Sequence, residues 1–239
     1  MYSKKTILSV YVFSFLAFMR PTLSFAYNPY IGLEYSQRSL NMAEGYGKGL
    51  FVKRLPQGNL LVGLKLNDYI GIEAGYSFSQ SATRTAYSTA GDRVLGNLIP
   101  PNLLPDRFLA AENSIRLFGP HLSINAYLPI GTSPFYGIAS IGFAMLALKA
   151  QFKPIGNQAS IAFTPAATEK LTRHFSSKKL VNRIMGGMGY QITEQVGIRF
   201  LIGYETTSRF KNIAPKELGP LRMSLKNNTI SNLGLNYSF

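Results

Sequence analysis

His121 and Ser123 are the residues of this chain whose types and spacing could support nucleophilic chemistry. They stand two positions apart in His121-Leu122-Ser123, and in a β-strand this spacing puts both side chains on one face. A serine nucleophile needs a base within hydrogen-bond reach and an acid behind that base. Glu73 lies on a neighbouring predicted strand with the same expected facing. The pattern is short and has little specificity, so we interpret these side chains as polar filling of an interior.

A second set of residues could form ion pairs in a buried space. Its members, all on the polar faces of predicted strands, are Glu34, Lys65, Glu73, Asn125 and Arg199. An isolated buried charge is unfavourable, so we expect these charges to be paired. Residue parity places Gly189 opposite Arg199, and the glycine leaves room for the guanidinium. We therefore predict an ion pair between Glu73 and Arg199 inside a filled lumen.

The elements that must position these residues are segments in which apolar and small or polar residues alternate with period two, as in half-buried strands. Eight such segments occur, at about 29–36, 59–66, 70–78, 116–128, 135–147, 184–192, 196–204 and 229–239. Parity pairs Leu66 with Ile70 and Ile192 with Val196 across short turns. We expect a β-bulge at Gly119-Pro120 near the start of the fourth strand. The last strand alternates as far as Phe239, and a terminal aromatic on the apolar face is typical of outer membrane barrels.

The lengths of the connections also point to a membrane barrel. Short connections at 67–69, 129–134 and 193–195 alternate with long ones at roughly 37–57, 80–115, 148–180 and 207–228. Short periplasmic turns and long extracellular loops are the rule for transmembrane barrels. A soluble lipocalin-like barrel would need its apolar face inside, where the Gly-rich polar faces would make a poor core. The prediction is an all-β fold, an eight-stranded antiparallel up-and-down transmembrane β-barrel.

The N-terminal stretch is typical of a secretory signal peptide. Met1–Lys5 is basic, Thr6–Met19 is largely apolar, and Ser24-Phe25-Ala26 is a small-x-small cleavage site. We therefore expect a signal peptide at 1–26 and the barrel at 27–239. The chain has no Cys, which excludes disulfides and thiolate metal sites.

Three stretches carry a resemblance to a known family. They are NLLVGLKLNDYIGIEAGYSFSQ at 59–80, GPHLSINAYLPI at 119–130 and GGMGYQITEQVGIRFLIGYE at 186–205. They resemble the strands and turns of the OmpA-like transmembrane domain, and the likeness does not extend to the long loops. The resemblance implies a barrel-only protein in the outer membrane of a Gram-negative bacterium, without the periplasmic domain of OmpA itself.

The same resemblance bears on the lumen. In the OmpA-like family a network of Glu, Lys and Arg in the lumen acts as a gate, and Glu73 and Arg199 match two of its members. Asn125 stands where the family has Lys, and Gly189 stands where it has a second Glu. We therefore expect a structural plug in preference to a gated pore, because an eight-stranded barrel leaves little open bore.

Charge is distributed unevenly along the chain, whose formal net charge is +14. The excess of Lys and Arg falls in the long loops 37–57, 148–180 and 207–228, which we expect to face the outside. The residues expected to bind polyanions are Lys170, Arg173, Lys178, Lys179, Arg209 and Lys211. A basic surface raises the local concentration of anionic partners. We expect contacts with outer membrane lipids and lipopolysaccharide, and with host polyanions or surface glycans, but not with nucleic acid.

Three functions remain in view. The leading hypothesis is a non-enzymatic surface binding or adhesion protein with long basic extracellular loops. The alternative is a structural or narrow-pore outer membrane protein. A lipid A hydrolase is a distant third, because His121-Leu122-Ser123 has the His-x-Ser spacing of the outer membrane lipid A deacylases, whereas the strand register points both residues away from lipid. We expect no cofactor and no metal.

Overall fold

The computed structural model describes residues 28–42, 49–88, 93–94, 97–98, 109–155, 175–206, 208–210 and 223–239. The predicted signal peptide lies outside this part of the chain. The strands are β1 Asn28–Ser39, β2 Arg54–Lys65, β3 Ile70–Phe78, β4 Ala82–Ser88, β5 Arg93–Val94, β6 Asn97–Leu98, β7 Leu109–Pro129, β8 Phe135–Ile155, β9 Phe175–Gln191, β10 Val196–Glu205, β11 Ser208–Phe210, β12 Met223–Leu225 and β13 Asn228–Ser238.

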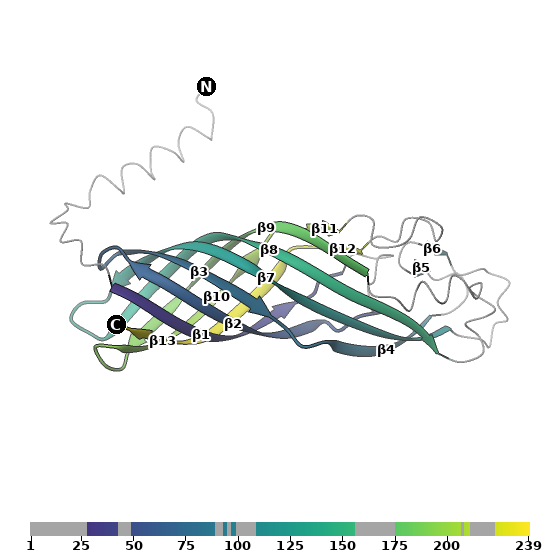
Figure 1. Cartoon of the computed structure of the whole chain (residues 1–239), viewed down its shortest axis with the longest axis horizontal. Helices are drawn as coiled ribbons and strands as arrows, with labels where there is room; N and C mark the ends of the chain where they lie inside the picture. Colours follow the sequence, from purple (N-terminus) through teal and green to yellow (C-terminus); the bar gives the residue numbers. More distant parts are fainter. Residues whose placement is uncertain are drawn as a thin grey trace, which may run out of the picture.

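The main sheet closes on itself. Its strands follow the order β3-β2-β1-β13-β10-β9-β8-β7-β4, and a further antiparallel pairing of β3 with β7 completes the ring (Figure 1). Strands β3 and β4 both pair with β7 and together form one wall of the barrel. Counted in this way the barrel has eight antiparallel strands in up-and-down order, which confirms the predicted fold class.

A β-bulge lies where β3 passes into β4. Phe78 is opposite Phe118, whereas Ala82 is opposite Ile115, so three residues of one strand face two of the other. Ser79 lies in the bulge, and its Oγ accepts a hydrogen bond from the Leu117 N–H at 2.9 Å. The bulge predicted at Gly119-Pro120 was therefore placed on the wrong strand of this pair. Between β7 and β8 the register is unchanged across Gly119-Pro120, so no residue is inserted there.

The short turns have the predicted register. Leu66 donates its N–H to the Ile70 carbonyl at 2.9 Å, and Ile192 donates to the Val196 carbonyl at 2.8 Å. The Asn67 side-chain oxygen accepts the N–H groups of Tyr69, the last residue before β3, and of Ile70, the first residue of β3, each at 2.8 Å. These turns and the C terminus gather at one end of the barrel (Figure 1). In an outer membrane barrel that end is the periplasmic one.

The two faces of the strands differ sharply in burial. On β8 the outward residues from Phe135 to Met145 are exposed and mostly apolar, while the residues between them face the lumen. Ten steps of about 3.4 Å, tilted by about 45°, span about 24 Å, which matches the apolar band of a transmembrane barrel. Within the described residues no helix has the length and apolarity to cross a bilayer.

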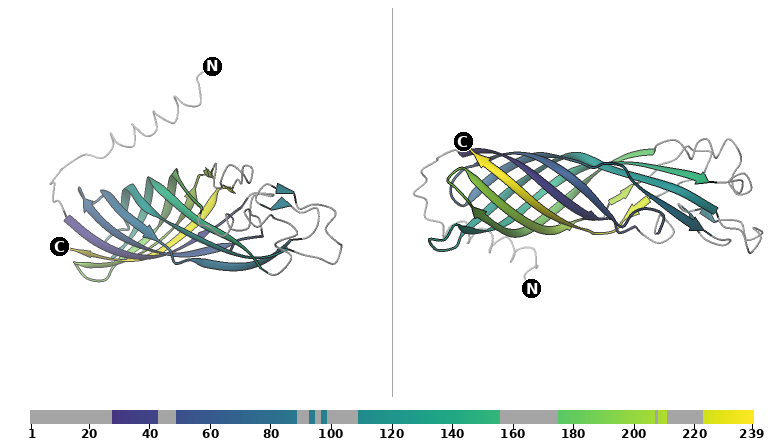
Figure 2. Two further views of the ribbon diagram at one scale, coloured as in Figure 1. Left: turned by 45° about the vertical axis from the view of Figure 1, so that its right-hand side comes forward. Right: turned by 90° about the horizontal axis from the view of Figure 1, so that it is seen from below.

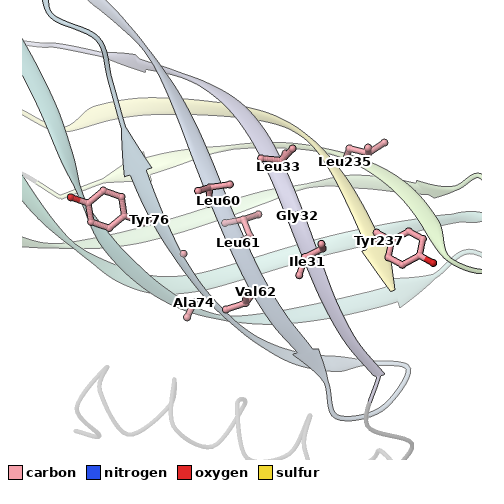
Figure 3. Close-up of a pocket in the computed structure, with 11 residues that line it drawn as sticks. Ile31, Gly32, Leu33, Leu60, Leu61, Val62, Ala74, Tyr76, Leu235 and Tyr237 are labelled. Atoms are coloured by element: carbon pink, nitrogen blue, oxygen red, sulfur yellow. The ribbon is translucent and has the colours of Figure 1, made fainter. Parts of the chain in front are cut away.

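A shallow groove interrupts the outer wall over β3, β2, β1 and β13 (Figure 3). Its volume is about 690 Å³, and its small floor residues include Gly32 and Ala74. The larger residues along it are Ile31, Leu33, Leu60, Val62, Tyr76, Leu235 and Tyr237. This apolar lining suits the acyl chains that surround a membrane barrel.

Strands β4, β7, β8 and β9 continue well beyond the barrel at the end opposite the turns (Figures 1 and 2). The predicted loops were therefore too long. The connection predicted at 148–180 is reduced to 156–174, and the one predicted at 80–115 contains β4 and the first residues of β7. Lys178 and Lys179, predicted to lie in a loop, belong to β9 and pair with Ala147 and Leu146 of β8.

An apolar core lies on the inner side of this extension, most of which was predicted to be loop. The largest of its members with less than 2% exposure are Leu55, Ile115, Leu117, Leu146, Leu148, Phe152 and Leu225. The segment after Gly49 covers part of the extension, because Phe51 is buried in this core and its carbonyl accepts a hydrogen bond from Arg84. The extracellular end of the barrel is thus packed like the interior of a soluble protein.

Gly119 provides a test of this packing. It has φ of 152°, and a Cβ added there would collide with the Met145 carbonyl oxygen across the β7–β8 pair. We expect Gly119→Ala to lower the free energy of unfolding by about 1–3 kcal/mol or more, because both the backbone conformation and the close approach favour glycine. The measurement is urea unfolding of the protein refolded in lipid vesicles.

Gly186→Ala is the matched control for this prediction. Its new Cβ would meet only the Ile138 carbonyl oxygen at 3.8 Å, an ordinary contact. It should be neutral or slightly stabilising, because glycine within a strand is less favourable than alanine. Equal unfolding midpoints for the two variants would contradict the close approach at Gly119.

Candidate functional site

A layer of charged side chains crosses the lumen around the guanidinium of Arg199. We call it the lower layer, because it is the nearer of two such layers to the periplasmic end. Arg199 Nη1 lies 2.6 Å from Glu73 Oε2, and Arg199 Nε donates to Glu34 Oε1 at 2.8 Å. The three residues come from β10, β3 and β1 and are all buried. The guanidinium therefore bridges two carboxylates across the barrel.

Glycine makes this bridge sterically possible, but not the glycine that the sequence suggested. Gly234 of β13 lies between Glu34 and Arg199 in the register, and a Cβ there would come within 2.7 Å of the Glu34 Cγ. Gly189 is indeed opposite Arg199, but a Cβ added at Gly189 would meet the ring of Tyr136. The prediction that Gly189 makes room for the guanidinium was wrong, because an aromatic ring from β8 fills that space.

Neutral donors surround the two carboxylates. Tyr30 Oη donates to Glu73 Oε2 at 2.8 Å, and Asn125 Nδ2 makes a longer contact of 3.5 Å with the same oxygen. Two further amides donate to Glu34 Oε2, those of Asn59 at 3.1 Å and Asn232 at 2.9 Å. A buried ion pair is tolerated when its remaining hydrogen-bonding capacity is satisfied in this way.

Lys65 lies away from this layer, although it was predicted to belong to it. On β2, Lys65 is two positions closer to the periplasmic turn than Gly63, the residue that pairs with Glu73. The Lys65 Nζ lies over the Tyr127 and Tyr136 rings, at 5.4 and 5.8 Å from their centroids. This ammonium group therefore lies over aromatic faces and does not take part in the layer of Glu34, Glu73 and Arg199.

A second charged layer, which the sequence analysis missed, crosses the lumen closer to the extracellular end. Arg38 Nη2 donates to Glu205 Oε1 at 2.8 Å, and Arg183 donates to the same oxygen through Nε at 3.0 Å and Nη2 at 2.8 Å. Extended parity would have found it, since Arg38 shares a face with Glu34, and Glu205 shares one with Arg199. Arg38 had been assigned to a loop because the first strand was ended too early.

His121 and Ser123 also face the lumen, as predicted. They are 7% and 8% exposed, on the side of β7 away from lipid. The His121 ring makes its hydrogen-bond contact with Ser77 Oγ, at 3.4 Å from Nδ1. The described residues contain no cluster of three potential metal ligands from His, Cys, Asp and Glu. The geometry supports polar filling of the lumen.

The residues predicted to bind polyanions are only partly described. Lys178 and Lys179 are exposed on β9, and they point to opposite faces of the strand. Arg209 belongs to β11, whereas Lys170, Arg173 and Lys211 lie outside the described residues.

The lower layer generates a stability prediction. Arg199→Ala should lower the free energy of unfolding by about 3–5 kcal/mol, because it leaves two buried carboxylates without their cation. The triple variant Glu34→Gln, Glu73→Gln, Arg199→Met should recover a large part of that loss, since no charge is then buried alone. Urea unfolding of each variant in detergent micelles measures the effect. A triple variant as unstable as Arg199→Ala would contradict the ionic origin of the loss.

Several known proteins are similar to this chain. Among solved structures, Neisserial surface protein A is similar with a TM-score of 0.51 and 10% identity, over 88% of this chain and 97% of that one. OprG from Pseudomonas aeruginosa gives 0.46 and 13%, over 90% and 96%. Ail of Yersinia pestis, crystallised with the heparin analogue sucrose octasulfate, gives 0.45 and 12%, over 89% and 99%.

At such identities the structural likeness concerns the fold alone. A comparison with curated proteins finds no significant match. The family model described as an outer membrane protein beta-barrel domain matches residues 8–239, which is nearly the whole chain. The chain therefore belongs to the outer membrane protein β-barrel domain family, and it is a β-barrel of the Gram-negative outer membrane.

Proposed function

We propose that this protein is a surface binding protein whose basic extracellular side captures polyanions such as sulfated glycans. The observation that carries the proposal is the sheet extension β4–β7–β8–β9, which stands beyond the apolar band and has its own buried core. A core of this kind holds side chains on the extension in fixed positions, as recognition of an extended ligand requires.

The charges on the described surface support the proposal. The exposed basic residues at the extracellular side are Lys53, Arg54, Arg116, Lys149, Lys153, Lys178, Lys179 and Lys226. Within the same described part of that side, the acidic residue with a solvent-accessible side chain is Glu112. At the periplasmic turns the exposed charged residues are instead acidic, Asp68 and Glu194. The field outside the barrel is therefore positive and attracts anions.

Filling of the lumen argues against a pore. Along β1 the inward residues pass from Glu34 in the lower charged layer to Arg38 in the upper one, and Leu40, directly after β1, belongs to the apolar core. A permeating ion would have to displace paired charges and then cross a dry layer, both of which are energetically unfavourable.

The binding prediction concerns residues 170–179. Replacing Lys170, Arg173 and Lys179 together by Gln should weaken heparin binding by about tenfold at low salt, because each exposed cation contributes a modest part of the attraction. Wild-type binding should fall as salt rises, since the screening length is about 8 Å at physiological ionic strength. Surface plasmon resonance with the protein in nanodiscs measures both effects.

The charge-preserving variant Lys170→Arg, Arg173→Lys, Lys179→Arg is the matched control and should bind like wild type. Equal affinity of the Gln variant and wild type would exclude residues 170–179 as the site. Salt-independent binding by wild type would contradict polyanion capture on this side of the barrel. In that case the basic residues would serve only to neutralise lipopolysaccharide.

A separate prediction concerns ion conductance through the filled lumen. Wild-type protein inserted into planar bilayers should show no stable open-channel conductance, because two ionic layers and one apolar layer fill its bore. Regular single-channel steps would favour the narrow-pore alternative over the binding function.

A further inference from the structure

We infer that Arg116, Lys149 and Lys178 form a binding site for the phosphate groups of an outer-leaflet lipid on the outer wall of the barrel. The three residues lie on β7, β8 and β9, which are neighbours in the sheet (Figure 1). Arg116 is directly opposite Lys149, and Lys178 is opposite Ala147, two positions from Lys149. All three side chains are exposed on the same outward face.

This arrangement is unfavourable without a counter-ion. Like charges directly opposite each other on neighbouring strands repel and destabilise a sheet. Both Arg116 and Lys149 lie over one aromatic ring, with the Arg116 Cζ at 5.4 Å and the Lys149 Nζ at 5.5 Å from the Phe118 centroid. The ion pairs among the described residues do not include any of these three cations. An anion placed between them would remove the repulsion.

The site lies where the exposed apolar face of β7, β8 and β9 ends toward the extracellular side, which is the level expected for outer-leaflet headgroups. Exposed aromatic residues mark the top of the apolar band on three other strands, at Tyr35, Phe78 and Tyr204. Such aromatic girdles lie at the membrane interfaces of barrels. On β7 the residue that corresponds to this girdle is Phe118. Arg116 is the next outward-facing residue of β7 toward the extracellular end.

The three basic residues are distinguished by lying on adjacent strands. On or directly after β1, β3 and β10 the outward residues one step above the aromatic girdle are uncharged, namely Gln37, Gln80 and Thr206, whereas β2 carries the exposed cation Arg54. Arg54 is opposite Ser39 and not opposite another cation, in contrast to Arg116 and Lys149. A single cation of this kind suits general neutralisation of the leaflet, whereas the group on β7, β8 and β9 points to a particular bound headgroup.

The surface below the site selects a lipid over a soluble polyanion. Exposed apolar side chains continue directly downward on the same face of β8 and β9, with Met145, Phe143 and Leu180. A ligand with phosphate above and acyl chains below would contact both parts at once. In the outer leaflet this amphiphile is lipid A, the phosphorylated anchor of lipopolysaccharide.

The test compares lipid A forms on the intact protein. In phosphatidylcholine nanodiscs, native mass spectrometry should detect diphosphorylated lipid A bound to wild type, and dephosphorylated lipid A should bind at least tenfold more weakly. The variant Arg116→Gln, Lys149→Gln, Lys178→Gln should lose about ten- to hundredfold in affinity for the phosphorylated form, as three interfacial cations are removed. If the triple variant does not insert, Lys149→Gln alone should weaken binding about fivefold.

A matched control removes three exposed cations that do not belong to the proposed site, in the variant Lys53→Gln, Arg54→Gln, Lys153→Gln. Lys153 is opposite Glu112, in contrast to Lys149. This control should retain wild-type affinity for lipid A. Equal losses in the two triple variants would overturn the site, as would equal binding of phosphorylated and dephosphorylated lipid A.

The lipid site does not depend on the proposed glycan binding, and the two can fail separately. The variant at positions 170, 173 and 179 leaves the outer wall intact and should keep its lipid A affinity. If the Arg116, Lys149, Lys178 variant loses heparin binding but keeps lipid A binding, the cluster is a soluble polyanion site and the lipid assignment is wrong.

Discussion

The backbone of a lipid-exposed strand must satisfy every N–H and C=O group within the protein, and this constraint governs the whole structure. A closed ring of strands meets it without a helix, because each strand has a partner on both sides. Here the ring closes through the β1–β13 and β3–β7 pairings. Once the ring is closed, the side chains pointing inward are sealed in a narrow space. Their charges must then be neutralised by one another.

The two charged layers meet this requirement with opposite compositions. The lower layer has one guanidinium between two carboxylates, and the upper layer has one carboxylate between two guanidiniums. Together they contain three positive and three negative groups, so the filled lumen is close to neutral although the chain as a whole is strongly basic. The excess charge is therefore left to the surface, where it can act on partners.

Much of the barrel could be predicted from period-two alternation, because lipid imposes an apolar outer face on every crossing strand. The turns at Leu66–Ile70 and Ile192–Val196 followed from parity alone. The extension could not be found by the same rule, since the polarity of the two faces reverses beyond the membrane. Arg116, Lys149 and Gln151 point outward there, while Leu117, Leu148 and Phe152 point inward. A search for outward apolar residues therefore ends the strands too early.

The same limit explains why only part of the candidate site could be predicted from the sequence. Glu34, Glu73 and Arg199 lie in the middle of clear strands, so their common facing was evident from sequence. Arg38, Arg183 and Glu205 lie just outside the strands predicted at 29–36, 184–192 and 196–204. Their facing was therefore not considered, although parity extended along each strand would have revealed it. The roles of Gly234 and Tyr136 required three-dimensional packing, because several glycines have the same parity.

The connectivity of the charged layers makes barrel assembly a cooperative event. Arg199 and Glu34 are separated by 165 positions in the chain, and Arg38 and Glu205 by 167. Each layer therefore joins the first strand of the barrel to strands near its end. In an incomplete sheet the charges of these layers would lack their partners, and unpaired charges are unfavourable in lipid. Apart from the Arg183–Glu205 pair within the β9–β10 hairpin, these charges are neutralised only when the seam between β1 and β13 forms. A partly formed barrel therefore has little stability of its own, and membrane insertion and ring closure are coupled in one step.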